Sequence, residues 1–109
     1  MNNEEVISVP QKLGLGVVNL TRSLAKRLEM SADGSSVLVA EVLPGSAAEA
    51  ANLHPGDLLL SIDDREVRSA AEAASHIRQA RRRGATEVDL LIEHARETRR
   101  LPLRFQPLT

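Results

Sequence analysis

The sequence predicts a small α+β domain, a partly open β-barrel or sandwich of five to six short strands with one long and one or two short helices. Three observations favour this fold class. The chain has 109 residues, enough for one domain with a modest core but not for two. Its apolar runs are short and are separated by turn residues. Only one stretch, residues 70–83, could form a long helix, and with Phe105 as the single aromatic residue the core is expected to be aliphatic.

The strands are predicted from apolar runs between turns. Residues 36–43 are nearly all apolar, which suits a strand buried on both faces. A tight turn is expected at Asp63-Asp64 and a hairpin turn at residues 95–98. Because Pro102 has no N–H group, the last strand is expected at a sheet edge or with Pro102 facing outward. The strands are expected at residues 17–20, 36–43, 57–62 and 65–67, around 88–92 and around 101–105.

Two identical hexapeptides, residues 46–51 and 69–74, read Ser-Ala-Ala-Glu-Ala-Ala. In each of them a Ser is followed three residues later by a Glu, which is the capping-box pattern of a helix start. The first helix is predicted to be short and to end at Asn52, a residue type that tolerates the left-handed conformation. The second is predicted from about residue 70 to residue 83 and ends at Gly84.

The chain divides into three parts by composition. Residues 1–11 are polar and acidic and are predicted to be a flexible linker. Residues 12–106 are expected to form the domain, and residues 107–109 a tail. Inside the domain, Thr21 is expected to cap a further short helix over residues 24–28.

Composition also excludes several classes of function. The net charge of −1 argues against a general nucleic-acid or membrane binder, and without Tyr or Trp there is no aromatic platform for stacked bases. The arginines at 81–83 fall at the end of the long helix, where cations offset its dipole. No apolar run approaches the roughly 18 residues of a membrane span. No signal peptide is visible, so if the parent protein is exported we expect this chain to be a piece of it.

No catalytic residue, metal or cofactor is expected. The three histidines, His54, His76 and His94, are interpreted as surface residues, and no Gly-x-Ser-x-Gly motif accompanies them. The chain has no Cys, which excludes a disulfide, a thiolate metal site and a cysteine nucleophile. Asp63-Asp64 and Glu66 offer carboxylates, but their spacing fits no calcium-binding loop.

A peptide-binding groove is the functional interpretation that the residues leave open. Gly14 and Gly16 alternate with Leu before the first predicted strand. Gly can turn backbone N–H groups inward, and successive inward N–H groups can bind an anion such as a peptide carboxylate. On the long helix, Ala70, Ala74 and Ile77 share one face, beside which a guest strand could add. The same residues fit an ordinary tight turn and an ordinary core stripe equally well.

Four segments then occur in series: Gly14–Val17, Val37–Ala48, Asn52–Ile62 and the helix that begins at Ser69. Together they resemble a PDZ domain of the bacterial type, as attached to the HtrA (Do-like) envelope serine proteases. The resemblance covers about residues 12–105, and the framework around Leu-Pro-Gly-Ser and Pro-Gly-Asp is its most specific part. It implies a circularly permuted PDZ fold that binds peptide C-termini or extended hydrophobic segments.

By position, the resemblance assigns the peptide-binding site to a carboxylate-binding loop, a peptide-pairing strand and a helix wall. The loop comprises Gly14, Leu15, Gly16 and Val17, the strand Val18 and Asn19, and the helix wall Ala70, Ala74 and Ile77. The backbone N–H groups of Leu15, Gly16 and Val17 would donate to the carboxylate. The pocket for the terminal side chain would lie among Leu15, Val17, Ala74 and Ile77.

Three departures from the family pattern stand out. Asn52 occupies a position where the family usually has Gly, which fits a left-handed backbone. Asp63-Asp64 replaces the common Asn-Gly turn, so that hairpin is expected to be looser. Residues 18–23 look shorter than usual, which affects the far end of the groove.

The expected function is therefore a non-catalytic peptide-binding module that recognises substrates or regulates an HtrA-like envelope serine protease. Its partners would be peptide or protein C-termini and a protease domain in the parent chain, with no nucleic acid and no membrane insertion. The resemblance implies a location in the periplasm or cell envelope. The alternative is a structural or oligomerisation module whose groove is filled by a neighbouring chain or by its own tail, residues 107–109.

Overall fold

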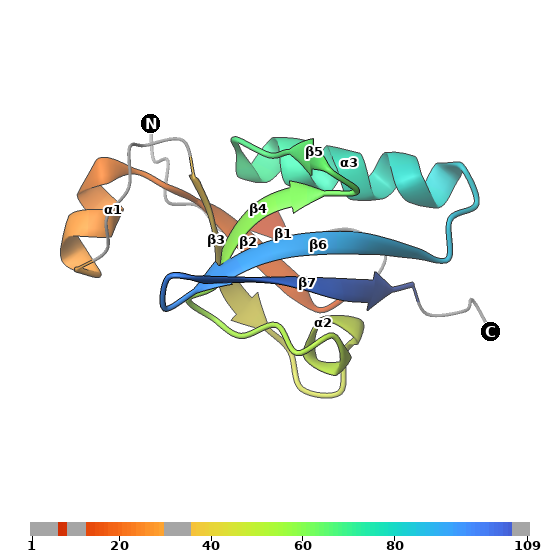
Figure 1. Ribbon diagram of the computed structural model, residues 1–109, viewed down its shortest axis with the longest axis horizontal. Coiled ribbons are helices and arrows are strands. Elements are labelled where there is room, and N and C mark those ends of the chain that lie inside the picture. Colours follow the sequence, from red (N-terminus) through yellow and green to blue (C-terminus); the bar gives the residue numbers. More distant parts are fainter. Residues whose placement is uncertain (1–6, 9–12, 30–35, 106–109) are drawn as a thin grey trace.

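The chain folds around one antiparallel sheet. The computed structural model describes residues 7–8, 13–29 and 36–105 (Figure 1). Within these ranges the sheet has seven strands in the order β1-β2-β3-β4-β6-β7, and β5 pairs with β4. The strands are β1 (Ile7–Ser8), β2 (Leu15–Leu20), β3 (Ser36–Val42), β4 (Leu58–Ile62), β5 (Arg65–Glu66), β6 (Glu87–His94) and β7 (Glu97–Arg104). The helices are α1 (Arg22–Arg27), α2 (Ala47–Ala50) and α3 (Ala70–Arg82), so the predicted α+β class is confirmed.

The hexapeptide helices begin as predicted. The Ser46 Oγ accepts a hydrogen bond from the Glu49 N–H at 3.1 Å, and the Ser69 Oγ accepts one from the Glu72 N–H at 3.0 Å. Each Glu carboxylate reaches back to a backbone N–H group just before its Ser. Asn52 follows α2 with φ +69°, the left-handed conformation that was expected there.

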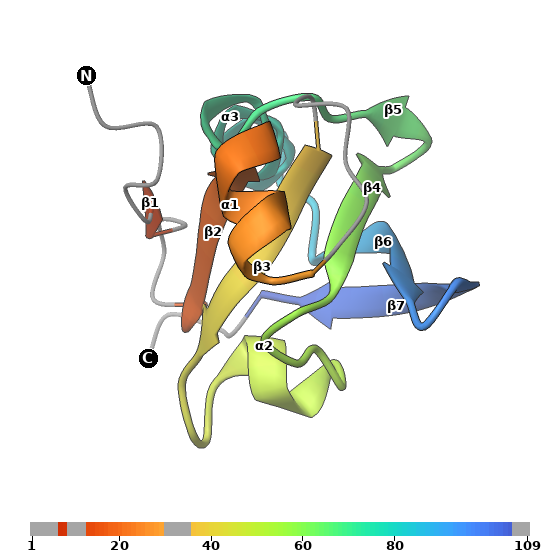
Figure 2. The same ribbon diagram turned by 90° about the vertical axis from the view of Figure 1, so that its left-hand side faces the viewer.

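The core is aliphatic and has two parts. The main cluster lies between the sheet, α2 and α3 and contains Leu15, Val17, Ile77 and most other buried side chains. A smaller cluster lies on the other face of β2 and β3 and joins Val18 to Ala25 of α1. In Figure 2 α1 lies in front of α3, and Figure 1 shows that the two helices are apart, with α1 at the left and α3 along one side of the sheet. Because side chains alternate along a strand, β2 is buried on both faces.

The two hairpins differ from expectation in detail. Ala95 and Arg96 both have positive φ, so a two-residue turn joins β6 to β7 and these strands run longer than predicted. The Asp63-Asp64 hairpin was expected to be loose, but it is tied to β6: the Asp89 N–H donates to the Asp63 Oδ1 at 2.8 Å.

Arg100, which lies on β7, also contacts the Asp63-Asp64 hairpin. Its guanidinium lies 2.8 Å from Asp89 and 3.1 Å from Asp64. These hydrogen bonds, the one to Asp89 first, raise the pKa of Arg100 above its usual value. The charged turn is therefore closed by a cation from the neighbouring strand.

Strand β7 ends the sheet, as Pro102 predicted. The Phe105 N–H donates to the Thr86 C=O at 2.9 Å, so odd-numbered residues of β7 turn their backbone toward β6. Pro102 consequently faces the open edge, where its missing N–H group costs no hydrogen bond within the sheet.

Candidate functional site

The loop before β2 is shaped by contacts with the start of α2. Gly14 has φ +73°, and a Cβ placed on it would overlap the Ser46 side chain. Its C=O accepts the Leu43 N–H at 2.9 Å, and the Leu13 C=O accepts the Ala48 N–H at 3.0 Å. A residue with a side chain would have to move the first turn of α2. Gly14 therefore has a structural reason to be Gly that the sequence did not show.

The backbone groups of Val17 face the edge of β2 that β3 leaves open. Val17 lies opposite Val39 of β3. The Val39 N–H donates to the Asp57 C=O and its C=O accepts the Gly56 N–H, each at 2.8 Å, so both groups point away from β2. In an antiparallel ladder, two residues that lie opposite one another either both point their N–H and C=O groups toward the other strand or both point them away from it. The N–H and C=O of Val17 are thus available to another strand.

Asn19 ties this strand to the long helix. Its Oδ1 accepts a hydrogen bond from the Ala70 N–H at 2.7 Å, across 51 positions of sequence. That N–H lies in the first turn of α3, where no carbonyl within the helix can accept it. The bond sets the spacing between β2 and α3, and it gives the Asn19 side chain a role that sequence reasoning had not assigned.

The structure brings the predicted loop, strand and helix wall together. Leu15, Val17, Ala70 and Ile77 all pack in the main core cluster. Ala74 is 2% exposed. Val18 is the exception, because its side chain packs on the opposite face of β2 with α1 and its backbone groups, which alternate with those of Val17, face β3.

Strand β1 occupies the open edge of β2. Ile7 pairs with Val17, and Ser8 pairs with Gly16. Strand β1 also contacts α3, which puts it in the space between β2 and that helix. Residues 1–11 were predicted to be a linker, so this strand was missed. The signal was the β-branched run of Val6, Ile7 and Val9 within the polar segment.

His54 and His94 lie together around Asp57, whereas His76 lies on α3. Asp57 is 2% exposed, accepts the His54 N–H at 3.0 Å and lies 2.8 Å from the His94 Nδ1. Asp57 thus holds its turn together. The described residues contain no group of three His, Asp or Glu side chains able to hold a metal ion, and none of their helices is long and apolar enough to cross a membrane.

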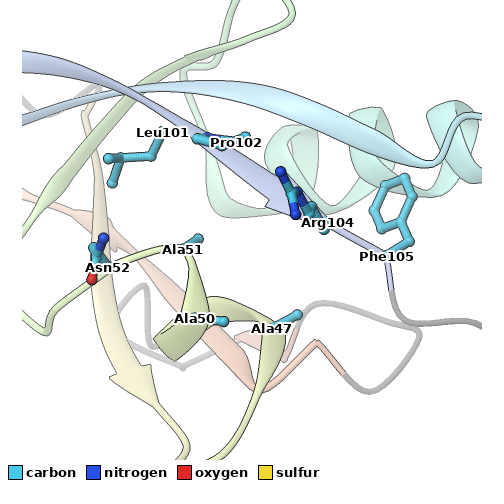
Figure 3. A pocket seen from close by; sticks show the side chains of 8 residues that line it. All are labelled: Ala47, Ala50, Ala51, Asn52, Leu101, Pro102, Arg104 and Phe105. Carbon is cyan, nitrogen blue, oxygen red and sulfur yellow. The ribbon is translucent and has the colours of Figure 1, made fainter.

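A separate hollow lies between α2 and β7, outside the predicted site (Figure 3). It has a volume of about 530 Å³. An adjoining hollow of about 440 Å³ shares Asn52 and Leu101 with it and reaches the His94–Asp57 pair. The first is lined by Ala47, Ala50, Ala51, Asn52, Leu101, Pro102, Arg104 and Phe105.

The strand order, the loop before β2 and the helix beside it were compared with known families. The family model described as PDZ domain matches residues 6–93. The chain belongs to the PDZ domain family. The match begins before β1 and ends within β6, so it includes both β2 and α3.

Curated relatives include bacterial proteases. The chain is 38% identical over 69 residues to a probable periplasmic serine endoprotease DegP-like of Chlamydia trachomatis, covering 63% of this chain and 14% of that protein. It is 32% identical over 72 residues to the putative serine protease HhoB of Synechocystis, covering 60% of this chain and 17% of that protein. The chain therefore spans only a small part of the relatives that it matches.

Solved structures show the same fold. The HtrA-type protease AlgW with decapeptide is 25% identical, with a TM-score of 0.73 over 89% of this chain and 30% of that one. The HtrA3 PDZ domain bound to a phage-derived ligand (FGRWV) is 16% identical, with a TM-score of 0.66 over 92% of this chain and 84% of that one. At that lower identity the likeness shows the fold alone.

Proposed function

We propose that residues 12–106 form a non-catalytic module that captures an extended peptide as an added strand on β2, beside α3. The observation that carries this proposal is the open edge at Val17, where backbone donor and acceptor face outward and hold a strand. Strand addition gives affinity through main-chain hydrogen bonds, and pockets for alternate side chains give specificity. The related HtrA-type protease AlgW, whose structure was solved with a decapeptide, supports the same mode.

The chemistry of the walls favours hydrophobic ligands. Leu15, Val17 and Ile77 are aliphatic, and Ala74 is small enough to leave room for a ligand side chain. No charged side chain is among these residues. A peptide ending in an aliphatic residue would bury apolar surface here, at about 25 cal/mol for each Å². Of the three N–H groups predicted to donate to its carboxylate, the one on Val17 faces this edge of β2.

In the parent protein, the module would recognise substrates for, or regulate, an HtrA-like serine protease of the periplasm or cell envelope. This part of the proposal rests on the names of the curated relatives, which are described as periplasmic endoproteases. Peptide binding would then regulate a protease domain in a different part of the parent chain, or bring substrates to it.

Titration of the chain with hydrophobic C-terminal peptides, followed by calorimetry, tests the proposal. Ala74→Met should fill the groove and weaken binding about tenfold, a change of roughly 1.4 kcal/mol. Ala71→Met is the matched control, because Ala71 lies on the exposed side of the same helix; it should bind like the unchanged chain. Equal affinities of the two variants would place the binding site elsewhere.

The second candidate is a structural or oligomerisation module with a filled groove. The pairing of β1 with β2 favours it, since an extended strand already lies in that position. The chain's own tail, residues 107–109, was also predicted to fill the groove, but these residues lie outside the part of the chain that the structure describes. Sedimentation over a range of concentrations, with and without residues 1–8, separates the candidates: an oligomer that falls apart on truncation supports this one, and an unchanged monomer opposes it.

A further inference from the structure

The register of β1 on β2 shows which residues occupy the open edge of β2. Ile7 and Ser8 pair with Val17 and Gly16, two of the three residues whose N–H groups would bind a terminal carboxylate. Yet Ile7 and Ser8 are internal residues with no free carboxylate. Strand β1 runs antiparallel to β2, so backbone without a free carboxylate lies opposite Val17 and Gly16.

The direction of the hydrogen bonds distinguishes the two residues of β1. Val17 turns both backbone groups toward β1, because the groups of its partner Val39 point the other way. Ile7 and Val17 are therefore the hydrogen-bonded pair of this ladder. Ser8 alternates with Ile7, so the backbone groups of Ser8 point away from β2. Among the described residues of this segment, Ile7 is the one whose N–H and C=O face Val17.

We propose that β1 is a tethered occupant of the groove, which a guest peptide must displace. This inference rests on the proposed function, since it concerns the same edge of β2. Only residues 9–12 separate β1 from Leu13. So short a tether holds an occupant at an effective concentration in the millimolar range. A groove that is open one-tenth of the time binds a guest about tenfold more weakly.

Burial of the groove walls agrees with an occupant in place. Leu15, Val17, Ala74 and Ile77 were expected to surround a pocket open to a ligand, but each is at most 3% exposed. Ala74 is not part of the main core cluster. Strand β1 contacts the helix that carries Ala74, whereas Leu15, Val17 and Ile77 are covered by the core whether or not β1 is in place.

Two proline variants of the full chain test the inference. Ile7→Pro removes the N–H group that faces Val17, whereas Ser8→Pro removes one that faces away, and it is the matched control. Ile7→Ala keeps the N–H group and reports the loss of the side chain alone. The probe is an acetylated hexapeptide, Glu-Glu-Val-Ile-Ser-Val, with the sequence of residues 4–9, prepared both amidated and as the free acid. The readouts are amide hydrogen exchange at Val17 and affinity for each peptide.

The inference predicts that the Val17 amide exchanges at least about tenfold faster in Ile7→Pro than in the unchanged chain, in Ile7→Ala or in Ser8→Pro. It also predicts that both peptides bind Ile7→Pro about tenfold more tightly than they bind Ser8→Pro. Equal exchange in the two proline variants would overturn the tethered occupant. Binding of the free acid alone would also overturn it, because β1 pairs with β2 without a free carboxylate.

These outcomes are separable from failure of the proposed function. If hydrophobic C-terminal peptides bind all variants with one affinity, the proposed function stands and the inference is wrong. If Val17 responds to Ile7→Pro while those peptides bind no variant, β1 occupies the edge and the proposed function is wrong.

Discussion

Replacement of Gly14 by Ala tests the account of the loop before β2. Gly14 has φ +73°, a conformation that costs an L-residue about 1–2 kcal/mol. The added Cβ would also overlap the side chain of Ser46, the N-cap of α2. Loss of a Ser cap costs about 1 kcal/mol. We therefore expect Gly14→Ala to lower the free energy of unfolding by about 2–3 kcal/mol.

Gly45→Ala is the matched control for this prediction. Gly45 has the same φ of +73°, but a Cβ there meets nothing within 4 Å. It should lose only the backbone contribution, about 1–2 kcal/mol. Urea unfolding followed by circular dichroism measures both variants. If Gly14→Ala and Gly45→Ala lose the same stability, the contact with Ser46 does not constrain the loop, and the reasoning is wrong.

Three further predictions concern stability. Asn19→Ala leaves the Ala70 N–H without its acceptor and should cost about 1–3 kcal/mol in urea unfolding, while Asn19→Asp, which keeps an acceptor, should cost less. Asn52→Gly removes a left-handed non-glycine residue and should raise the melting temperature; a lower one would contradict the cap assignment. Arg100→Gln should destabilise slightly at low salt, with the difference shrinking at high salt, because its ion pairs are exposed; a salt-independent loss would contradict that origin.

The raised pKa of Arg100 fixes how its contribution depends on pH. A group whose pKa is higher in the folded than in the unfolded chain stabilises the fold below the unfolded pKa, and that stabilisation is lost as the pH rises through the folded one. For Arg100 the folded pKa lies above the ordinary arginine value, which is itself far above neutral pH. Deprotonation of Arg100 should therefore have no influence on stability near neutral pH. A loss of the Arg100 contribution between neutral and mildly alkaline pH would contradict this.

Local patterns predicted most elements because their causes are local. Ser46 and Ser69 mark helix starts through hydrogen bonds that span only three residues. Pro102 marks an edge because the missing N–H group is a property of that residue. The β6–β7 turn was placed less well, since Ala95 and Arg96 adopt positive φ without the usual Gly or Asn.

The parts of the site that escaped prediction depend on contacts distant in sequence. The capping of α3 by Asn19 joins residues 51 positions apart, and no local pattern records it. The same holds for the steric constraint on Gly14, which comes from Ser46. Strand β1 was missed because two residues of strand within an acidic segment carry too little hydrophobic pattern to outweigh its composition. The groove residues themselves were located through the family resemblance.

A titration of the isotope-labelled chain with a hydrophobic C-terminal peptide, followed by amide chemical shifts, tests the central claim most directly. The account predicts that the largest changes fall along β2, at Leu15 to Asn19, and on the facing side of α3 around Ala74. Changes centred instead on the hollow between α2 and β7, around Ala47 and Phe105 (Figure 3), would contradict strand addition at β2.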